Sequence, residues 1–247
     1  MRGFDRPLKP EWIYKIVKLV KIGDKISDLK FEMENCIPEL NGDGNRKART
    51  IINRYFLTVD EDTKKGYISD SIIIKLIKNL EFDEAKSVMF FILLIQEPIL
   101  QYYSSLLKKY FLDSKEFDLK FLQKLAIEKT GERDISGRSL RNFINTLVDF
   151  NIMGINENKN YFWKDKLFIS DELWCELFKI YGRYCLKSPQ IIFEELNENI
   201  FFYFEKIEID LIAKRFNGQI WDYVKRSNTS YITIYEKYRN DLRDNIG

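Results

Sequence analysis

The chain has 247 residues, 45% of them apolar, and its 19 Phe and 14 Tyr can fill a substantial core, which excludes a disordered chain. Its 40 basic and 38 acidic residues nearly cancel, which excludes nucleic-acid binding through bulk positive charge but leaves room for a local basic face. It has no histidine, which removes imidazole bases, Ser-His-Asp and Cys-His nucleophile systems and most zinc sites.

The first part of the chain predicts three short helices. Pro10 as a start signal and Gly23 as a stop signal predict a first helix over residues 10–23. Ser27 as an N-cap predicts a second helix over residues 27–36. A loop rich in asparagine and glycine follows, and Asn45 is then expected to cap the third helix. Because three short helices in this order are typical of a helix-turn-helix, we expect residues 1–62 to form an N-terminal module of that kind.

The third predicted helix carries a basic face. Residues Arg46–Asn53 follow the pattern R-x-x-R-T-x-x-N, and helical spacing places these residues opposite an apolar face. Arginine and asparagine suit base edges, and lysine and arginine suit phosphates. The alternative is an ordinary solvated helix surface. The candidate nucleic-acid contacts here are Arg46, Lys47, Arg49, Thr50, Asn53 and Arg54.

The middle of the chain is expected to be entirely helical. The predicted helices cover residues 69–80, with a cap at Ser69 or Asp70, and then 83–95, 98–110 and 118–129, the last with Phe121 facing inward. The apolar run Val88–Ile95 is far shorter than the roughly 20 residues that cross a bilayer, so it indicates a helix buried on all sides. With no secretory signal and no CxxC motif, we expect a reduced, cytoplasmic protein without a membrane segment.

The stretch from Asp134 to Trp163 is the most informative part of the chain. Ser136 is expected to cap an amphipathic helix, and the loop Asn156–Lys159 joins two segments of alternating pattern into a hairpin. This is the second half of a winged helix-turn-helix, in which the helix enters the major groove. The helix repeats the earlier layout as R-x-x-R-N-x-x-N, against the same alternative of a solvated surface. The candidate contacts are Arg138, Arg141, Asn142, Asn145 and, on the wing, Lys159, with Lys129 and Lys164 as flanking phosphate contacts.

The last part of the chain is less regular. Asp171 is expected to cap a helix through Tyr181, and Ser188-Pro189 to begin another that leads to Leu196. A helix over 207–216 and a hairpin of strands 220–224 and 231–235 follow. A small third module and a C-terminal extension fit this pattern equally well.

No catalytic set emerges from the sequence. There is no Walker loop, no GxGxxG and no nucleophile elbow, and the acidic run Asp60–Asp62 lacks the partners of a calcium loop. We therefore expect a protein that is not an enzyme and that needs no cofactor and no metal. The leading hypothesis for its function is binding of double-stranded DNA, and the alternatives are a protein-interaction scaffold and a protein that binds structured RNA.

A co-linear set of features between about Trp12 and Tyr184 resembles the BrxA family, the small helical component of BREX bacteriophage-exclusion systems. The arginine-rich helix continues into Arg54-Tyr55-Phe56-Leu57, the apolar helix Ala85–Ile95 follows, and Pro98-Ile99-Leu100 precedes a helix with Lys108, Lys109 and Tyr110. Finally, Ser136–Gly154 matches the serine-capped pattern S-x-x-[ST]-x-[RK] and the strand that follows it.

The resemblance implies a role in antiviral defence and phage resistance, a helical two-part fold, DNA binding and no catalysis, with other BREX components as partners. The region after about Leu186 lies outside it. In total, we expect a mainly α, multi-helical chain with helix-turn-helix or winged-helix-like modules and short β-hairpins. Its expected parts are residues 1–62, 63–186 with the winged-helix-like module, and 187–247.

Overall fold

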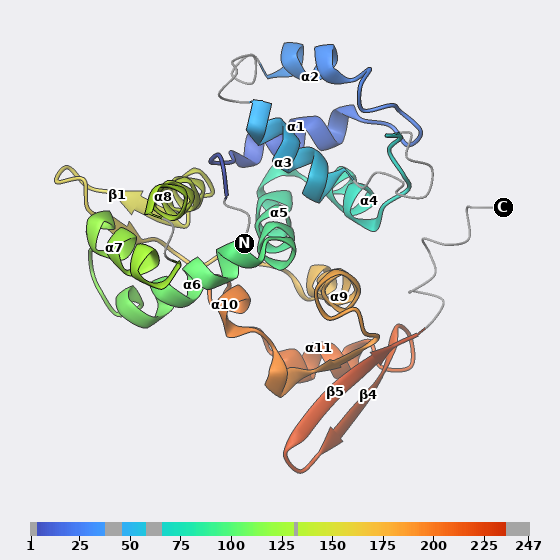
Figure 1. Ribbon diagram of the computed structural model, residues 1–247. Helices are drawn as coiled ribbons and strands as arrows, with labels where there is room; N and C mark the ends of the chain where they lie inside the picture. The colour runs from blue at the N-terminus through green and yellow to red at the C-terminus, as the bar shows by residue number, and fades with distance from the viewer. Residues whose placement is uncertain (1–3, 38–45, 58–65, 131–132, 236–247) are drawn as a thin grey trace.

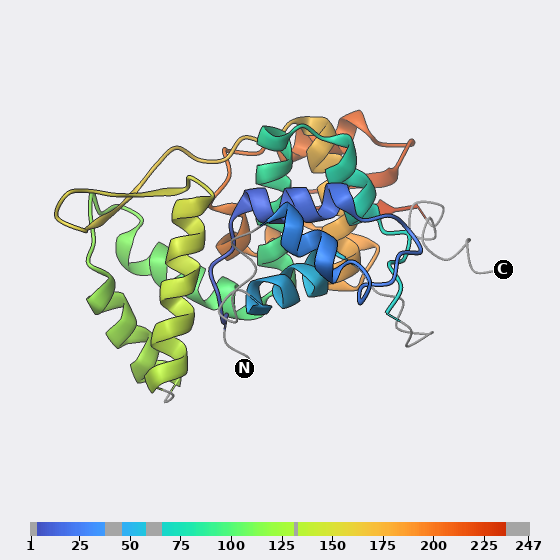
Figure 2. The ribbon, with the colours of Figure 1, turned by 90° about the horizontal axis from the view of Figure 1, so that it is seen from above.

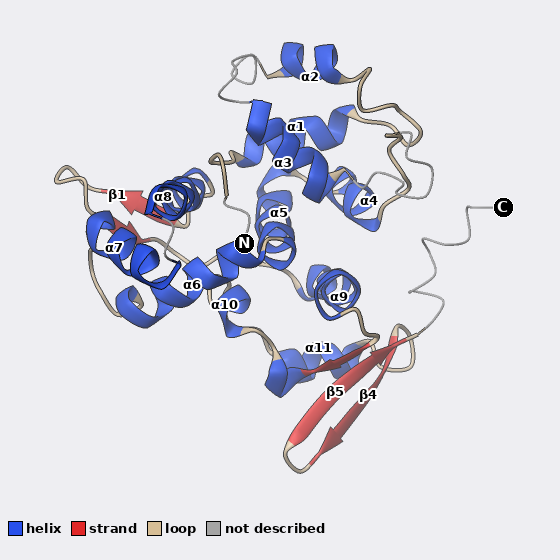
Figure 3. Ribbon diagram, viewed as in Figure 1, coloured by secondary structure: helices blue, strands red, loops and turns tan. Residues whose placement is uncertain are grey.

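The computed structural model describes residues 4–37, 46–57, 66–130 and 133–235. Within them the chain is mostly helical and carries two small antiparallel sheets, which confirms the expected mainly α class (Figures 1 and 3). The predicted boundary at residue 62, the Asn45 cap and the acidic run 60–62 lie outside the described residues.

Four helices form the N-terminal part: α1 (Pro10–Leu19), α2 (Lys30–Cys36), α3 (Arg46–Phe56) and α4 (Ile72–Asn79). Helix α1 contacts the other three and also α5. It ends before Gly23, contrary to the prediction, because Val20 is extended and Gly23 takes a positive φ of 86°. The amide of Gly23 donates to the carbonyl of Ile68 at 2.8 Å, so the glycine serves a tertiary contact rather than a helix stop.

Helix α4 begins at a different serine from the expected one. Ser71, not Ser69 or Asp70, is the N-cap, and its hydroxyl accepts from the amide of Ile73 at 3.2 Å. Three neighbouring Ser and Asp residues offer the same capping chemistry, so composition alone does not choose among them.

Helix α5 (Phe82–Gln96) is buried on all sides from Val88 to Ile95, as the apolar run predicted. Helix α6 (Pro98–Phe111) follows at an angle of 103°, because Glu97 is extended in front of Pro98. No single helix of the described residues is long and apolar enough to span a membrane, and the bent pair α5–α6 reaches that size only by adding the two together.

Helices α6, α7 (Leu119–Thr130) and α8 (Arg133–Asp149) pack together beside a two-stranded sheet of β1 (Met153–Ile155) and β2 (Tyr161–Trp163). The predicted hairpin is therefore confirmed. Two details differ from the prediction. Helix α8 already runs through Ser136, which is not a cap, and the ring of Phe121 is 50% exposed and packs edge-on against Phe111.

The C-terminal part packs against α5 through α9, the π-helix that follows it, and α10. Its sheet has the order β3-β5-β4 and includes the predicted second hairpin. Ser170, not Asp171, caps α9, and the segment after Pro189 forms a strand rather than a helix, because Ile191 pairs with Ile232. The elements are α9 (Asp171–Ile180), the π-helix Tyr181–Leu186, β3 (Gln190–Ile192), the 3-10 helix Phe193–Glu195, α10 (Glu198–Phe201), α11 (Ile209–Arg215), β4 (Trp221–Arg226) and β5 (Thr229–Ile234).

An aromatic cluster joins the parts. The ring of Phe91 on α5 lies 5.5 Å from that of Trp174, 5.7 Å from that of Phe201 and 5.8 Å from that of Phe204, all in edge-on arrangements. Because these rings come from α5, α9, the end of α10 and the segment just after it, the core is continuous between the middle and the C-terminal part. Figure 2 shows α5 and α9 in the middle of the molecule, with the α7–α8 pair to one side.

Candidate nucleic-acid interface

Helix α8 presents a narrow basic strip. Arg138 and Arg141 are exposed and Asn145 is half-buried, at positions i, i+3 and i+7, which lie on one side of a helix. Neither arginine forms an ion pair with a residue that the structure describes. Three of the predicted contacts of this helix therefore share one accessible side, and both guanidinium groups have their donors available.

Asn142 does not belong to that strip. It is 9% exposed, and its amide nitrogen donates to the main-chain carbonyl of Phe4 at 2.8 Å. The prediction that Asn142 lies on the exposed face is wrong, because the N-terminal segment covers this side of α8. Ser139 and Thr146, one turn before and after Asn142, accept hydrogen bonds from the main chain of the same segment, a role that no local sequence pattern indicates.

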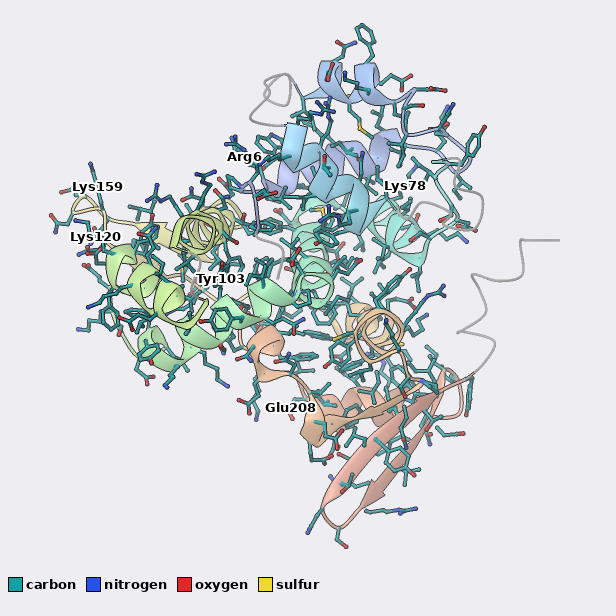
Figure 4. All side chains as sticks on the ribbon, viewed as in Figure 1. Arg6, Lys78, Tyr103, Lys120, Lys159 and Glu208 are labelled. Carbon is teal, nitrogen blue, oxygen red and sulfur yellow. The ribbon has the colours of Figure 1, made fainter. Side chains whose placement is uncertain are left out.

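The hairpin lies along the opposite side of α8. Lys159 is exposed in its loop with a positive φ of 62°, and the amide of Asn160 donates to the side chain of Asn156 at 2.9 Å, which closes the turn. Figure 4 shows Lys159 at the outer end of this hairpin. Burial raises the pKa of Tyr161 on β2, and the positive charge of Arg141 acts against this shift.

The hairpin is tied back to the helices. Phe117, between α6 and α7, exchanges two main-chain hydrogen bonds with Tyr161, at 2.9 and 3.0 Å, and the indole of Trp163 donates to the carbonyl of Phe111 at 2.8 Å. Lys164 donates to the side chain of Asn151. The side chain of Lys129 lies outside the described residues.

Helix α3 carries a second exposed basic strip, but not all of its predicted residues reach it. The exposed members are Arg46, Lys47, Thr50 and Arg54. Arg49 is instead 9% exposed and pairs with Glu34 of α2, and its guanidinium group holds the pKa of that carboxyl below its usual range. The prediction that Arg49 is exposed is therefore wrong. Asn53 is half-buried on the same helix.

Two contacts anchor α3 against the junction of α5 and α6. The Tyr55 hydroxyl donates to the carboxylate of Glu97, and the side-chain amide of Gln96 donates to the Tyr55 carbonyl at 2.7 Å. Burial, together with the neighbouring Glu97 carboxylate, raises the pKa of Tyr55 to about 12. These two hydrogen bonds attach the C-terminal end of α3 to the junction of α5 and α6.

The described residues contain no group of three or more Cys, Asp or Glu side chains arranged to hold a metal ion. Cys36, Cys175 and Cys185 are free thiols, and burial raises the pKa of Cys175 to about 12, so that thiol is far from the thiolate form that reacts or binds metal. The structure thus supplies two basic helix surfaces and leaves the predicted absence of catalysis as a prediction.

The comparisons with known proteins bear on the fold alone. No protein-family model and no curated protein matches the chain. A solved structure named "SspB crystal structure" is similar to it with a TM-score of 0.59 and 11% sequence identity, over 97% of this chain and 84% of that one. At that identity, the likeness establishes that nearly the whole chain follows an architecture already seen in a solved protein.

Proposed function

We propose that this protein binds double-stranded DNA without catalysis, with α8 and the β1–β2 hairpin as the main contact surface. The observation that carries the proposal is the pair of exposed arginines on α8, Arg138 and Arg141, neither of which is paired with a described residue. Exposed guanidinium groups on one helix side match the phosphates and guanine edges of duplex DNA.

The order of elements supports a winged-helix assignment for this region. Helix α6, the short bridge at Phe117, helices α7 and α8 and then the β1–β2 hairpin follow one another as the elements of a winged helix do, with α8 in the place of the recognition helix. In that assignment the hairpin is the wing, and Lys159 in its loop is placed to contact the backbone.

The strip on α3 supports a second, weaker contact. Its exposed members are Arg46, Lys47 and Arg54. The N-terminal segment lies between α3 and α8 in both views of the ribbon (Figures 1 and 2). We assign this strip to phosphate contact rather than base recognition, because Arg49 is turned inward to Glu34 and leaves the strip without its central guanidinium group.

The test is the affinity for a duplex of about 20 base pairs, followed by fluorescence anisotropy over a series of salt concentrations. Each phosphate contact adds about 0.9 to the slope of log K against log salt. We expect the double variant Arg138→Ala/Arg141→Ala to lose about one to two units of that slope and tenfold or more in affinity at 50 mM salt.

The matched control is Lys206→Ala/Lys214→Ala, which also removes two positive charges, but from the C-terminal part, where both lysines are exposed. Wild-type binding that is absent at 50 mM salt, or equal slopes for the two double variants, would overturn the proposal. A duplex RNA competitor run in the same assay assigns the surface to structured RNA if it displaces the DNA at equal concentration, and failure to bind either one favours the scaffold alternative.

The proposal extends to the system that this binding serves. The co-linear sequence features shared with the BrxA family support a place in a BREX-type anti-phage system in the cytoplasm, beside the other components of that system. Complementation tests this: in a host that carries such a system with this gene deleted, the wild-type chain should restore phage resistance in a plaque assay. The Arg138→Ala/Arg141→Ala variant should fail to restore it. If that variant does restore resistance, the role in defence does not depend on the arginines of α8.

A further inference from the structure

The segment Phe4–Lys9, here called the N-terminal arm, runs along α8 before α1 begins. Phe4 and Leu8 of the arm are buried in the core, at 1% and 0% exposure. The arm and the hairpin loop lie on opposite sides of α8 in both views of the ribbon (Figures 1 and 2). The basic strip of α8 is thus bounded by the arm on one side and the hairpin on the other.

The arm is held by side chains of α8 rather than by a strand. The amide of Phe4 donates to the Ser139 hydroxyl at 2.6 Å, Asn142 donates to the Phe4 carbonyl at 2.8 Å, and the amide of Leu8 donates to the Thr146 hydroxyl at 2.9 Å. These three α8 residues are 0 to 9% exposed, at positions i, i+3 and i+7. Buried hydrogen bonds of this kind fix both the path and the register of the arm.

Arg6 lies between the two anchored residues of the arm. It is half-buried and forms no ion pair with any residue that the structure describes. Figure 4 shows it beside α8, on the side away from Lys159. The neighbouring cation is already engaged, since the ammonium group of Lys9 lies 5.2 Å from the ring centre of Trp12. Arg6 is therefore the cation of the arm that lies next to the basic strip of α8.

We infer that the arm is part of the DNA-binding surface, with Arg6 contacting a backbone phosphate next to the α8 strip and Ser139, Asn142 and Thr146 acting as positioning residues. This inference rests on the proposed DNA binding and deepens it. Asn142 then serves DNA binding indirectly, by clamping the arm, instead of by reading a base. The physical advantage is entropic, because an anchored cation loses less conformational freedom on binding than one on a free tail.

The salt dependence of binding tests the role of Arg6. Arg6→Ala should lower the slope of log K against log salt by about 0.9, which makes the affinity ratio of wild type to variant shrink about 3.5-fold between 50 and 200 mM salt. Arg6→Lys keeps the charge and should keep the slope. The matched control is Lys21→Ala, which removes an exposed lysine just beyond α1, away from the arm, and should leave the slope unchanged.

A double-mutant cycle tests the clamp. Asn142→Ala should lower the salt slope as Arg6→Ala does, and the combination Arg6→Ala/Asn142→Ala should lower it no further, because both changes remove the same contact. A purely structural role for Asn142 would instead leave the slope unchanged, or would add its loss to that of Arg6. Circular dichroism melts of each variant check that the fold is retained.

The outcomes separate this inference from the proposed function. Wild-type protein that does not bind the duplex overturns both. Binding that depends on Arg138 and Arg141 but keeps the wild-type slope in Arg6→Ala overturns the arm alone. A lowered slope in Arg6→Ala with an additive loss in the double variant supports Arg6 and overturns the clamp.

Discussion

Gly154 on β1 has no room for a side chain. It pairs with Phe162 across the hairpin, and an added Cβ would lie 2.3 Å from the tip of the Phe162 ring and 2.7 Å from its two neighbouring ring carbons. Ordinary carbon contacts are about 3.5–4 Å, so Gly154→Ala requires the ring to move by roughly 1 Å or more. The backbone at Gly154 needs no positive φ, so the steric contact with the ring is the relevant cost.

The size of the effect follows from two opposing contributions. Forcing a methyl group into an occupied site costs about 1–3 kcal/mol, whereas alanine in a strand gains about 0.5–1 kcal/mol over glycine through lower chain entropy. We expect Gly154→Ala to lower the free energy of unfolding by about 0.5–2 kcal/mol in the wild-type background. In the Phe162→Ala background the contact is gone, so the same change should raise stability by about 0.5–1 kcal/mol.

Urea unfolding of the four proteins, followed by circular dichroism and by tryptophan fluorescence, measures this reversal of sign. The coupling between the two positions should be about 1–3 kcal/mol. If Gly154→Ala has the same effect in both backgrounds, the ring does not lie over the glycine as described. If Gly154→Ala is stabilising in the wild-type background, the ring moves away freely and the steric reasoning is refuted.

Three further predictions concern the core and its charges. Because Arg49 lowers the pKa of Glu34, their interaction stabilises the fold above the ordinary glutamate pKa and is lost as the pH falls through the lowered value. The urea midpoint of Glu34→Gln should therefore lie below that of wild type at pH 7, and the two midpoints should converge below about pH 4.3. A difference between the midpoints that stays constant with pH would contradict this. Iodoacetamide at pH 8 should modify the exposed Cys36 in the folded protein and leave Cys175 unmodified until unfolding, since burial raises the pKa of Cys175 to about 12. If mass spectrometry finds that both thiols are modified at the same rate, the burial argument is refuted. Phe91→Ala should cost about 3–5 kcal/mol in urea unfolding, because the ring is fully buried in the aromatic cluster, and a loss below about 1 kcal/mol would mean that the cluster does not join the parts.

Local sequence signals predict several elements correctly. The apolar run of α5 predicted its burial on all sides, Pro98 marked the start of α6, and the turn formers at 156–159 and 227–229 marked both hairpins. Each of these signals acts within a few residues of chain, so no knowledge of distant contacts was needed. The exposure of Arg138 and Arg141 follows in the same way from helical spacing.

Long-range contacts determine which polar residues of the two basic helices remain accessible. Arg49 and Asn142 have the same residue types and spacing as their exposed neighbours. Arg49 nevertheless forms an ion pair with Glu34, and Asn142 donates a hydrogen bond to the main-chain carbonyl of Phe4. The strand after Pro189 likewise depends on its pairing with β5, about 40 residues later in the chain. The physical reason is common to all three: helical periodicity defines the sides of an element, but the segments that cover a side come from distant parts of the chain, and no local pattern encodes them.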